Sequence, residues 1–67
     1  MKLFINDLIE EFKKDKLTVK ELTELKNIPE NGTAVAVNDR LIKRDDWTTT
    51  ILTDNDSVTL ISAAFGG

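Results

Sequence analysis

The chain has 67 residues, 40% hydrophobic and 31% charged, which suits one small folded domain and is too apolar for a disordered segment. Nine Lys and Arg against twelve Asp and Glu give a net charge of −3, which argues against nucleic acid as the main partner and favours a basic protein surface. Cys and His are absent from the sequence, which excludes disulfides, metal sites built on these residues and catalysis by either side chain. With no signal peptide or membrane-spanning run recognisable, we expect a cytoplasmic protein that does not bind membranes and is a monomer when free.

Residues 1–6 alternate in the manner of a half-buried strand, with the odd-numbered side chains on the buried face. Asn6 and Asp7 then signal a turn. Residues 8–16 are ambiguous, because their apolar side chains have helical spacing and Asp7 is a possible cap. Since an isolated first strand needs a partner, we interpret 8–16 as the return strand of a hairpin.

The clearest local signal is the start of a helix. Thr18 and Glu21 fit a capping box, and Leu17 and Leu22 fit the accompanying hydrophobic staple. We therefore predict a helix from about 19 to 26. Four side chains of this segment are expected to face the core: Val19, Leu22, Leu25 and Ile28.

Pro29 and Gly32 end the helical segment, and residues 34–37 alternate small and branched side chains as a strand does. The two valines of this strand are expected to face the core, and its two alanines to leave the other sheet face flat. A turn at 38–39 and a short strand at 41–42 follow.

Residues 43–50 are polar apart from Trp47, and three successive threonines favour extended or turn structure over a helix. Trp47, Ile51 and Leu52 are expected to cover the core rather than to bind a ligand.

Residues 54–56 form a tight turn in which Asn55 tolerates a positive φ. The two aspartates of this turn lack the Gly and the distal Glu of a calcium loop, so we expect no metal there. Residues 57–62 alternate again and make the last strand, with Val58 and Leu60 inward.

The expected fold is α+β, with one main helix packed across a mixed sheet of four to five strands. We expect residues 1–62 to form this domain and residues 63–67 to form a flexible tail. The tail ends in Gly66 and Gly67, which have no Cβ and so let a backbone thread a narrow channel. Such an end suits acyl chemistry performed on it by another protein's active site, although taken alone a Gly-Gly end is more often a frayed terminus or a cloning scar.

Six segments, in this order and spacing, resemble the ThiS-like sulfur carriers of thiamine biosynthesis, which belong to the ubiquitin-like β-grasp fold and to the ThiS/MoaD group. They are residues 1–6, 17–22, 35–38, 44–47, 52–58 and 64–67. The chain departs from the family pattern at Asn55, where Gly is usual, and at Phe65, where a smaller residue is expected.

The resemblance implies a carrier rather than an enzyme. In such carriers the terminal glycine, here Gly67, is adenylated by a ThiF-like partner that uses ATP and Mg²⁺. A sulfur donor such as a cysteine desulfurase then converts it to a thiocarboxylate, which supplies sulfur to a ThiG-like thiazole synthase. The carrier itself binds no cofactor and no metal.

An outer sheet face opposite the helix is the expected docking surface for these partners. Its predicted residues, together with two that precede the terminal glycines, are Phe4, Ala36, Thr59, Ile61, Ala64 and Phe65. The alternative is that these are scattered exposed apolar residues with no common role.

Three other functions remain open from the sequence. The small subunit of molybdopterin synthase shares the fold and the Gly-Gly end, and a ubiquitin-like modifier would be joined through Gly67 to lysines of other proteins. A plain interaction domain, in which the two glycines are incidental, is the third.

Overall fold

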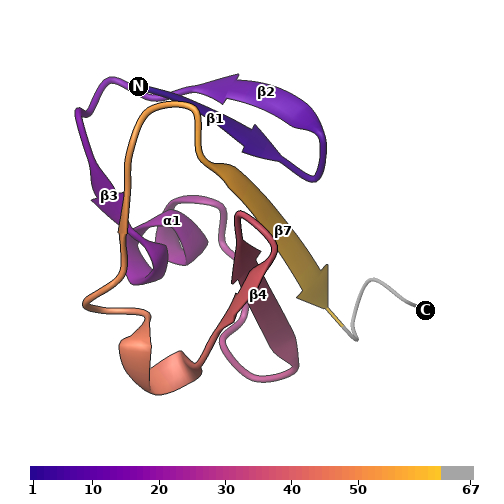
Figure 1. Ribbon diagram of the computed structural model, residues 1–67. Helices are drawn as coiled ribbons and strands as arrows, with labels where there is room; N and C mark the ends of the chain where they lie inside the picture. The colour runs from indigo at the N-terminus through magenta and orange to yellow at the C-terminus, as the bar shows by residue number, and fades with distance from the viewer. Residues whose placement is uncertain (63–67) are drawn as a thin grey trace.

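The computed structural model describes residues 1–62 of the chain, and these form a five-stranded mixed sheet crossed by one helix (Figure 1). The strands of this sheet are β1 (Lys2–Ile5), β2 (Leu8–Glu11), β4 (Thr33–Val37), β5 (Arg40–Ile42) and β7 (Ser57–Ser62). Their order is β2-β1-β7-β4-β5. Only β1 and β7 are parallel, and the other three pairs are antiparallel. The predicted fold class is confirmed.

The β1–β2 hairpin is confirmed, and the helical alternative for its second half is wrong. Asn6 and Asp7 adopt φ values of 50° and 69°, the left-handed pair that a two-residue hairpin turn requires. The second strand ends at Glu11 rather than at residue 16, because Glu11 pairs with Lys2, the first residue of β1. Beyond that pair, Met1 and Phe12 still exchange hydrogen bonds of 2.7 Å, but neither residue belongs to a strand.

The helix α1 (Val19–Leu25) begins at the predicted capping box. Thr18 Oγ1 accepts a hydrogen bond from the Glu21 amide at 3.0 Å, and Glu21 Oε1 accepts one from the Thr18 amide at 2.8 Å. The predicted burial of Leu25 is wrong, since its side chain is 56% exposed and Thr23 is buried instead. At about 100° per residue, Thr23 lies four residues after Val19 and therefore on the same, buried face of the helix. Leu25 lies six residues after Val19 and therefore on the flank of the helix.

A second, two-stranded sheet pairs β3 (Leu17–Thr18) with β6 (Ile51–Leu52), and no local pattern in the sequence indicates it. It ties the long connection after β5 to the start of the helix, where the Val19 amide donates to the Thr50 carbonyl at 3.0 Å. Leu52 is fully buried, as expected, but Ile51 is 52% exposed and that prediction is wrong. Adjacent residues of a strand point to opposite sides, so only one of the pair faces the core.

Trp47 is a core residue, as predicted. It follows a short 3₁₀ turn, η1 (Arg44–Asp46), and its side chain is 1% exposed. Its indole Nε1–H donates to the Ile42 carbonyl at 3.2 Å, so burial leaves no unpaired donor.

The core is formed by side chains of the sheet, the helix, the β3–β6 pair and Trp47 in the connection after β5. Its buried residues come from every part of the described chain: Leu3, Ile5, Leu17, Val19, Leu22, Val35, Trp47, Leu52, Val58 and Leu60. Ile28 and Val37, both expected to face the core, pack against it and are half-buried.

Candidate functional site

The strand that leads to the C-terminus occupies the middle of the sheet. β7 lies between β1 and β4, and its side chains alternate as predicted, with Val58 and Leu60 buried and Thr59 and Ile61 exposed. The last described residue, Ser62, pairs with Thr33 of β4. The end of the chain therefore continues directly from the central strand. Four predicted site residues lie outside the described residues: Ala64, Phe65, Gly66 and Gly67.

The four other predicted docking residues share one face of the sheet, opposite the helix. Ala36 pairs with Thr59, and Ala34 pairs with Ile61 one step closer to the C-terminus. Phe4 pairs with Ser57, which lies on the same side of β7 as Thr59. Thr59 and Ile61 are exposed, while Phe4 and Ala36 are half-buried. The structure brings these residues together, and their binding role stays a prediction.

Two further apolar residues belong to this face and were not predicted. Ile9, paired with Phe4, is 60% exposed, and Leu41, paired with Ala36, is 68% exposed. They extend the apolar surface to both edges of the sheet. The two-residue turns fix both pairs, so counting outward from each turn along its hairpin was the signal that would have found them. From here on, the outer face means Phe4, Ile9, Ala34, Ala36, Leu41, Thr59 and Ile61.

One edge of the outer face carries a pair of residues with opposite charges. Lys2 lies on the same side of β1 as Phe4, and its Nζ lies 5.5 Å from the centroid of the Phe4 ring, a cation–π distance. Glu11 pairs with Lys2 across the hairpin. Protein–protein interfaces commonly combine an apolar centre with a polar rim, and the docking role of this face stays a prediction.

The two aspartates of the turn at 54–56 accept hydrogen bonds from backbone amides. Asp54 Oδ1 accepts from the Lys2 amide at 2.7 Å, and Asp56 Oδ2 accepts from the Thr53 amide at 2.9 Å. Asn55 adopts φ 72°, as predicted for a residue replacing Gly. These carboxylates close the turn that starts β7, and within residues 1–62 no group of three or more acidic side chains is placed to hold a metal ion.

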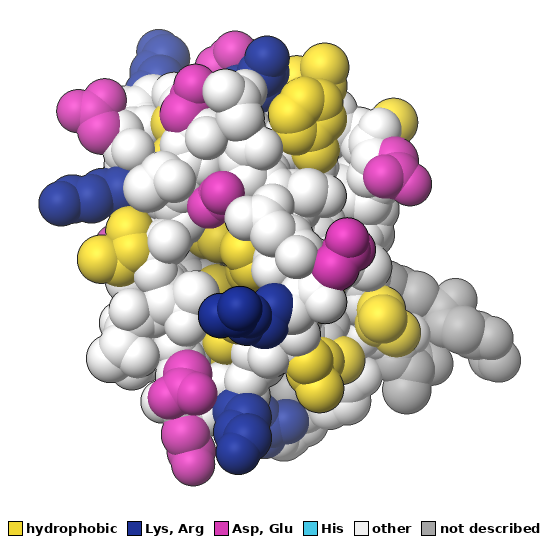
Figure 2. All heavy atoms as spheres, in the orientation of Figure 1, with side chains coloured by type: hydrophobic (Ala, Val, Ile, Leu, Met, Phe, Trp, Pro, Cys, Tyr) yellow, Lys and Arg dark blue, Asp and Glu magenta, His cyan; other side chains and the backbone are white. Residues whose placement is uncertain are grey.

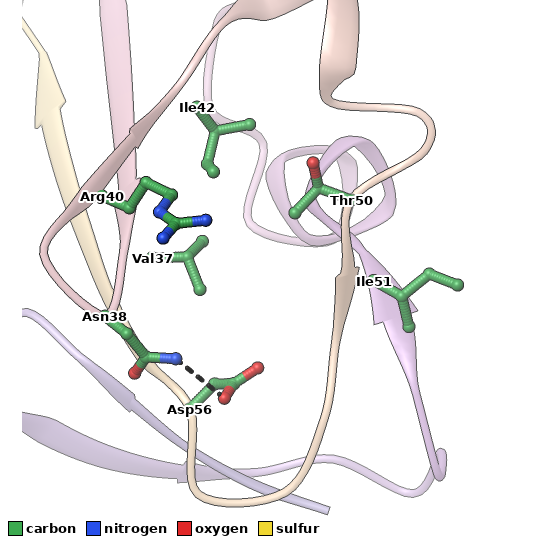
Figure 3. A pocket seen from close by; sticks show the side chains of 7 residues that line it. All are labelled: Val37, Asn38, Arg40, Ile42, Thr50, Ile51 and Asp56. Carbon is green, nitrogen blue, oxygen red and sulfur yellow. Dashed lines mark hydrogen bonds between the residues drawn. The ribbon is translucent and has the colours of Figure 1, made fainter.

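The helix side of the molecule has a hollow in which apolar atoms lie beneath polar and charged side chains (Figure 2). A cleft of about 390 Å³ lies between the β4–β5 hairpin and the segment that carries β6, and Arg40 extends into it (Figure 3). Its lining residues are Val37, Asn38, Arg40, Ile42, Thr50, Ile51 and Asp56. The polar pair in this cleft, Asn38 and Asp56, is already joined by a hydrogen bond of 3.1 Å. The Thr50 hydroxyl in the lining donates to the Asp46 carbonyl at 2.7 Å. The cleft therefore presents one cation, Arg40, and its other polar side chains already have hydrogen-bond partners.

Shifted pKa values occur in the first turn of the helix and in the loop that follows the helix. The hydrogen bond from the Thr18 backbone holds the pKa of Glu21 below its ordinary value. Hydrogen bonding between Lys20 and Glu30 raises the pKa of the first and lowers the pKa of the second. All three side chains are solvent-accessible and belong to the capping and loop structure.

The sequence model of the ThiS family matches residues 3–67. This chain belongs to the ThiS family. Among solved structures, it is similar to the thiamine biosynthesis protein ThiS from Geobacter metallireducens, with a TM-score of 0.87 and 22% sequence identity. The likeness covers 92% of this chain and 93% of that one, and it establishes the shared fold. No curated protein matches the chain.

The family match confirms the resemblance given by the six sequence segments. ThiS proteins are small sulfur carriers of thiamine biosynthesis and work with partner enzymes rather than as enzymes themselves. In the described part of this chain, no helix has the length and apolar character needed to cross a membrane. The cytoplasmic location stays a prediction.

Proposed function

We propose that this ThiS-family chain carries sulfur for the thiazole of thiamine on the carboxyl group of Gly67. The observation that supports this is the match to the family over residues 3–67, which includes the terminal glycines, on a chain whose central strand leads directly to them. A strand paired on both sides gives the terminal segment a fixed origin on a rigid domain.

The proposed chemistry begins on a ThiF-like adenylating enzyme that uses ATP and Mg²⁺. A carboxylate oxygen of Gly67 attacks the α-phosphorus of ATP, and pyrophosphate leaves. A sulfur nucleophile at the oxidation level of sulfide then attacks the acyl carbon, and AMP leaves with the bonding electron pair. The product is a thiocarboxylate, which a ThiG-like thiazole synthase receives. A cysteine desulfurase is the expected cellular source of the sulfur. It hands the sulfur on as a persulfide, so a thiol reductant must supply two electrons to break the S–S bond and bring the sulfur to the sulfide level.

Activation is needed because a carboxylate resists nucleophilic attack. Its leaving group would be oxide, whereas an acyl-adenylate expels a phosphate ester. All acid–base and metal chemistry in this scheme belongs to the partner. The carrier needs only a deliverable carboxylate and a docking surface, which fits a sequence without Cys or His.

We further propose that the outer face docks on the activating enzyme. Ile61 and Ala34 form the row of this face closest to the C-terminal end of β7. An apolar surface there is continuous with the segment that must enter the partner's active site. Exposed side chains such as Ile61 and Leu41 would be covered in the complex, which explains their exposure on so small a domain.

The test is reconstitution with a cognate adenylating enzyme, ATP, Mg²⁺ and sulfide, followed by mass spectrometry of C-terminal peptides. We expect an AMP adduct on the peptide that ends in Gly67, and after sulfide addition the exchange of one oxygen for one sulfur at the same carboxyl group. Deleting Gly67 should abolish both products while the circular dichroism spectrum stays that of the parent. Products at any other residue, or turnover by the deleted variant, would contradict the proposal.

The same preparation separates the remaining alternatives. Sulfur transfer to thiazole synthase is expected, whereas transfer to a molybdopterin synthase large subunit would assign the other carrier role. A ladder of high-mass conjugates in cells would indicate a ubiquitin-like modifier, and activity that survives loss of Gly67 would indicate a plain interaction domain.

A further inference from the structure

We propose that Asn6 is a positioning residue, which fixes the C-terminal half of β7 in the sheet and thereby the point from which the terminal segment reaches a partner's active site. This inference rests on the proposed function. It assigns a role to a residue far from the C-terminus in sequence, and it is carried by hydrogen bonds that no local pattern indicates.

The parallel pairing of β1 with β7 stops before β7 does. Ile5 pairs with Val58, and the Asn6 amide donates to the Val58 carbonyl at 2.9 Å. The main chain then turns away into β2, so no strand residue follows to meet Leu60. Without a substitute, the Leu60 amide and carbonyl on that side would lose their partners at the edge of the core.

The side chain of Asn6 supplies both missing partners. Its Oδ1 accepts from the Leu60 amide at 2.8 Å, and its Nδ2 donates to the Leu60 carbonyl at 3.3 Å. A carboxamide has the same donor and acceptor as a peptide group, so it extends the ladder by one residue. Leu60 therefore has Asn6 as its neighbour on one side and lies opposite Val35 of β4 on the other.

The turn makes this geometry possible. Asn6 has φ 50°, a left-handed conformation that Asn and Gly adopt more readily than other residues. The main chain can leave the sheet there while the side chain stays alongside β7. Gly would also form the turn but has no carboxamide, so the requirement for Asn is separate from the requirement of the hairpin.

The chain contains its own control for this interaction. Asn38 and Asp39 repeat the Asn6–Asp7 turn with identical φ values of 50° and 69°. Asn38 also bonds to β7, since its Oδ1 accepts from the Ser57 amide at 2.9 Å. That bond lies at the beginning of β7, whereas the bond of Asn6 lies toward the end that continues to Gly67. The two asparagines differ in the end of the strand that they hold.

Catalysis on a tethered group is sensitive to where the tether begins, and a misplacement of about 1 Å can cost on the order of 100-fold in rate. Loosening Leu60 should therefore lower the rate at which docked carrier is adenylated. It should not change docking itself, because the side chain of Asn6 is engaged with the backbone of β7 and is not part of the outer face. The signature of a positioning role is thus a lower kcat with a nearly unchanged KM.

The experiment compares Asn6→Gly with Asn38→Gly in steady-state adenylation by the activating enzyme, and in amide hydrogen exchange of the free proteins. For Asn6→Gly we expect exchange at Leu60 to accelerate and kcat to fall by roughly tenfold, with KM within about twofold of the parent. Asn38→Gly should leave Leu60 exchange and kcat close to the parent values. Asn6→Asp keeps the Oδ1 acceptor but turns the Nδ2 donor into an oxygen that faces the Leu60 carbonyl, so its kcat should also fall below that of the parent.

Equal losses of kcat in the two glycine variants would overturn the proposal, since general destabilisation would then explain both. Fast exchange at Leu60 with an unchanged kcat would also overturn it, because the strand end would be loose and yet harmless. If Asn6→Gly fails to fold, Asn6→Asp decides by the same two measurements. If the parent is not adenylated at all, the proposed function fails, while the exchange data still show whether Asn6 holds Leu60.

Discussion

Leu60 and Ile61 are adjacent in β7 and point to opposite faces, so truncating each to Ala should have very different costs. Leu60 is 7% exposed and belongs to the core, whereas Ile61 is 59% exposed on the outer face. Leu→Ala in a core costs roughly 2–5 kcal/mol, and we expect about 2–3 here because a site near the end of the sheet can relax. Ile61→Ala should cost less than about 1 kcal/mol.

The expected cost of Leu60→Ala is large relative to the total stability of the domain. A domain of this length has a free energy of unfolding of roughly 3–10 kcal/mol, so Leu60→Ala removes a substantial part of it. The expected fall in Tm is roughly 10–20 °C, from about 4–8 °C for each kcal/mol in a domain of this size. In urea, with a slope of about 1 kcal/mol per molar, the midpoint should fall by about 2–3 M.

Trp47 provides the probe for this measurement. It is the one tryptophan of the chain and is buried in the core, so its fluorescence reports loss of packing. Urea unfolding of the parent and the two variants is followed by this signal and by circular dichroism. Equal midpoint shifts for Leu60→Ala and Ile61→Ala, or a larger shift for Ile61→Ala, would refute the assignment of inner and outer faces.

Four further outcomes are expected. Thr18→Ala should cost about 1 kcal/mol of stability, because the Glu21 amide loses its acceptor, and coincident urea midpoints would exclude this. The pKa of Glu21 is lower in the folded protein than its ordinary value of 4.5, so its contribution to stability is fully present above that value and is lost as pH falls through the folded pKa. The difference in unfolding free energy between the parent and Glu21→Gln should therefore shrink in acid. Ile61→Asp should weaken binding to the adenylating enzyme at least about tenfold in calorimetry, while its Tm stays near that of the parent. Equal affinities of parent and variant would show that the outer face is not the docking surface. Gly66→Val should slow adenylation steeply, because a β-branched side chain disfavours positive φ and fills a narrow channel. An unchanged rate would show that activation does not require position 66 to lack a side chain.

The sequence by itself determined the features that depend on neighbours along the chain. The capping box of Thr18 and Glu21 is a contact over three residues, and both of its bonds form as the pattern predicts. Asn55 takes the positive φ expected of it, and the alternation of β7 places Val58 and Leu60 inside. These are short-range effects of dihedral preference and period, so they can be read from the chain.

Recognition of the ThiS family also came from sequence, through six segments in fixed order. The family match over residues 3–67 confirms it. The roles of Gly66 and Gly67 rest on that resemblance and on their position, since they lie outside the described residues. The terminal chemistry is therefore a matter for the reconstitution experiment.

Only the tertiary structure decided which side chains the rest of the molecule covers. Leu25 and Ile51 are apolar and were expected inside, yet both are more than half exposed. Thr23 is buried instead, with its hydroxyl donating to the Lys20 carbonyl at 2.8 Å. Burial depends on what packs against each turn of the helix and each side of a two-residue strand, and a local period does not contain that information.

The same holds for the contacts around β7. Ile9 and Leu41 join one outer face only because their hairpins both flank β7. Asn6 reads in the sequence as a turn residue, and its bond to Leu60 spans 54 positions along the chain. A side chain that completes a strand on a distant segment follows from how the strands are ordered in the sheet. The sequence shows that Asn6 suits a turn, whereas the order of the strands in the sheet determines that its carboxamide bonds to Leu60.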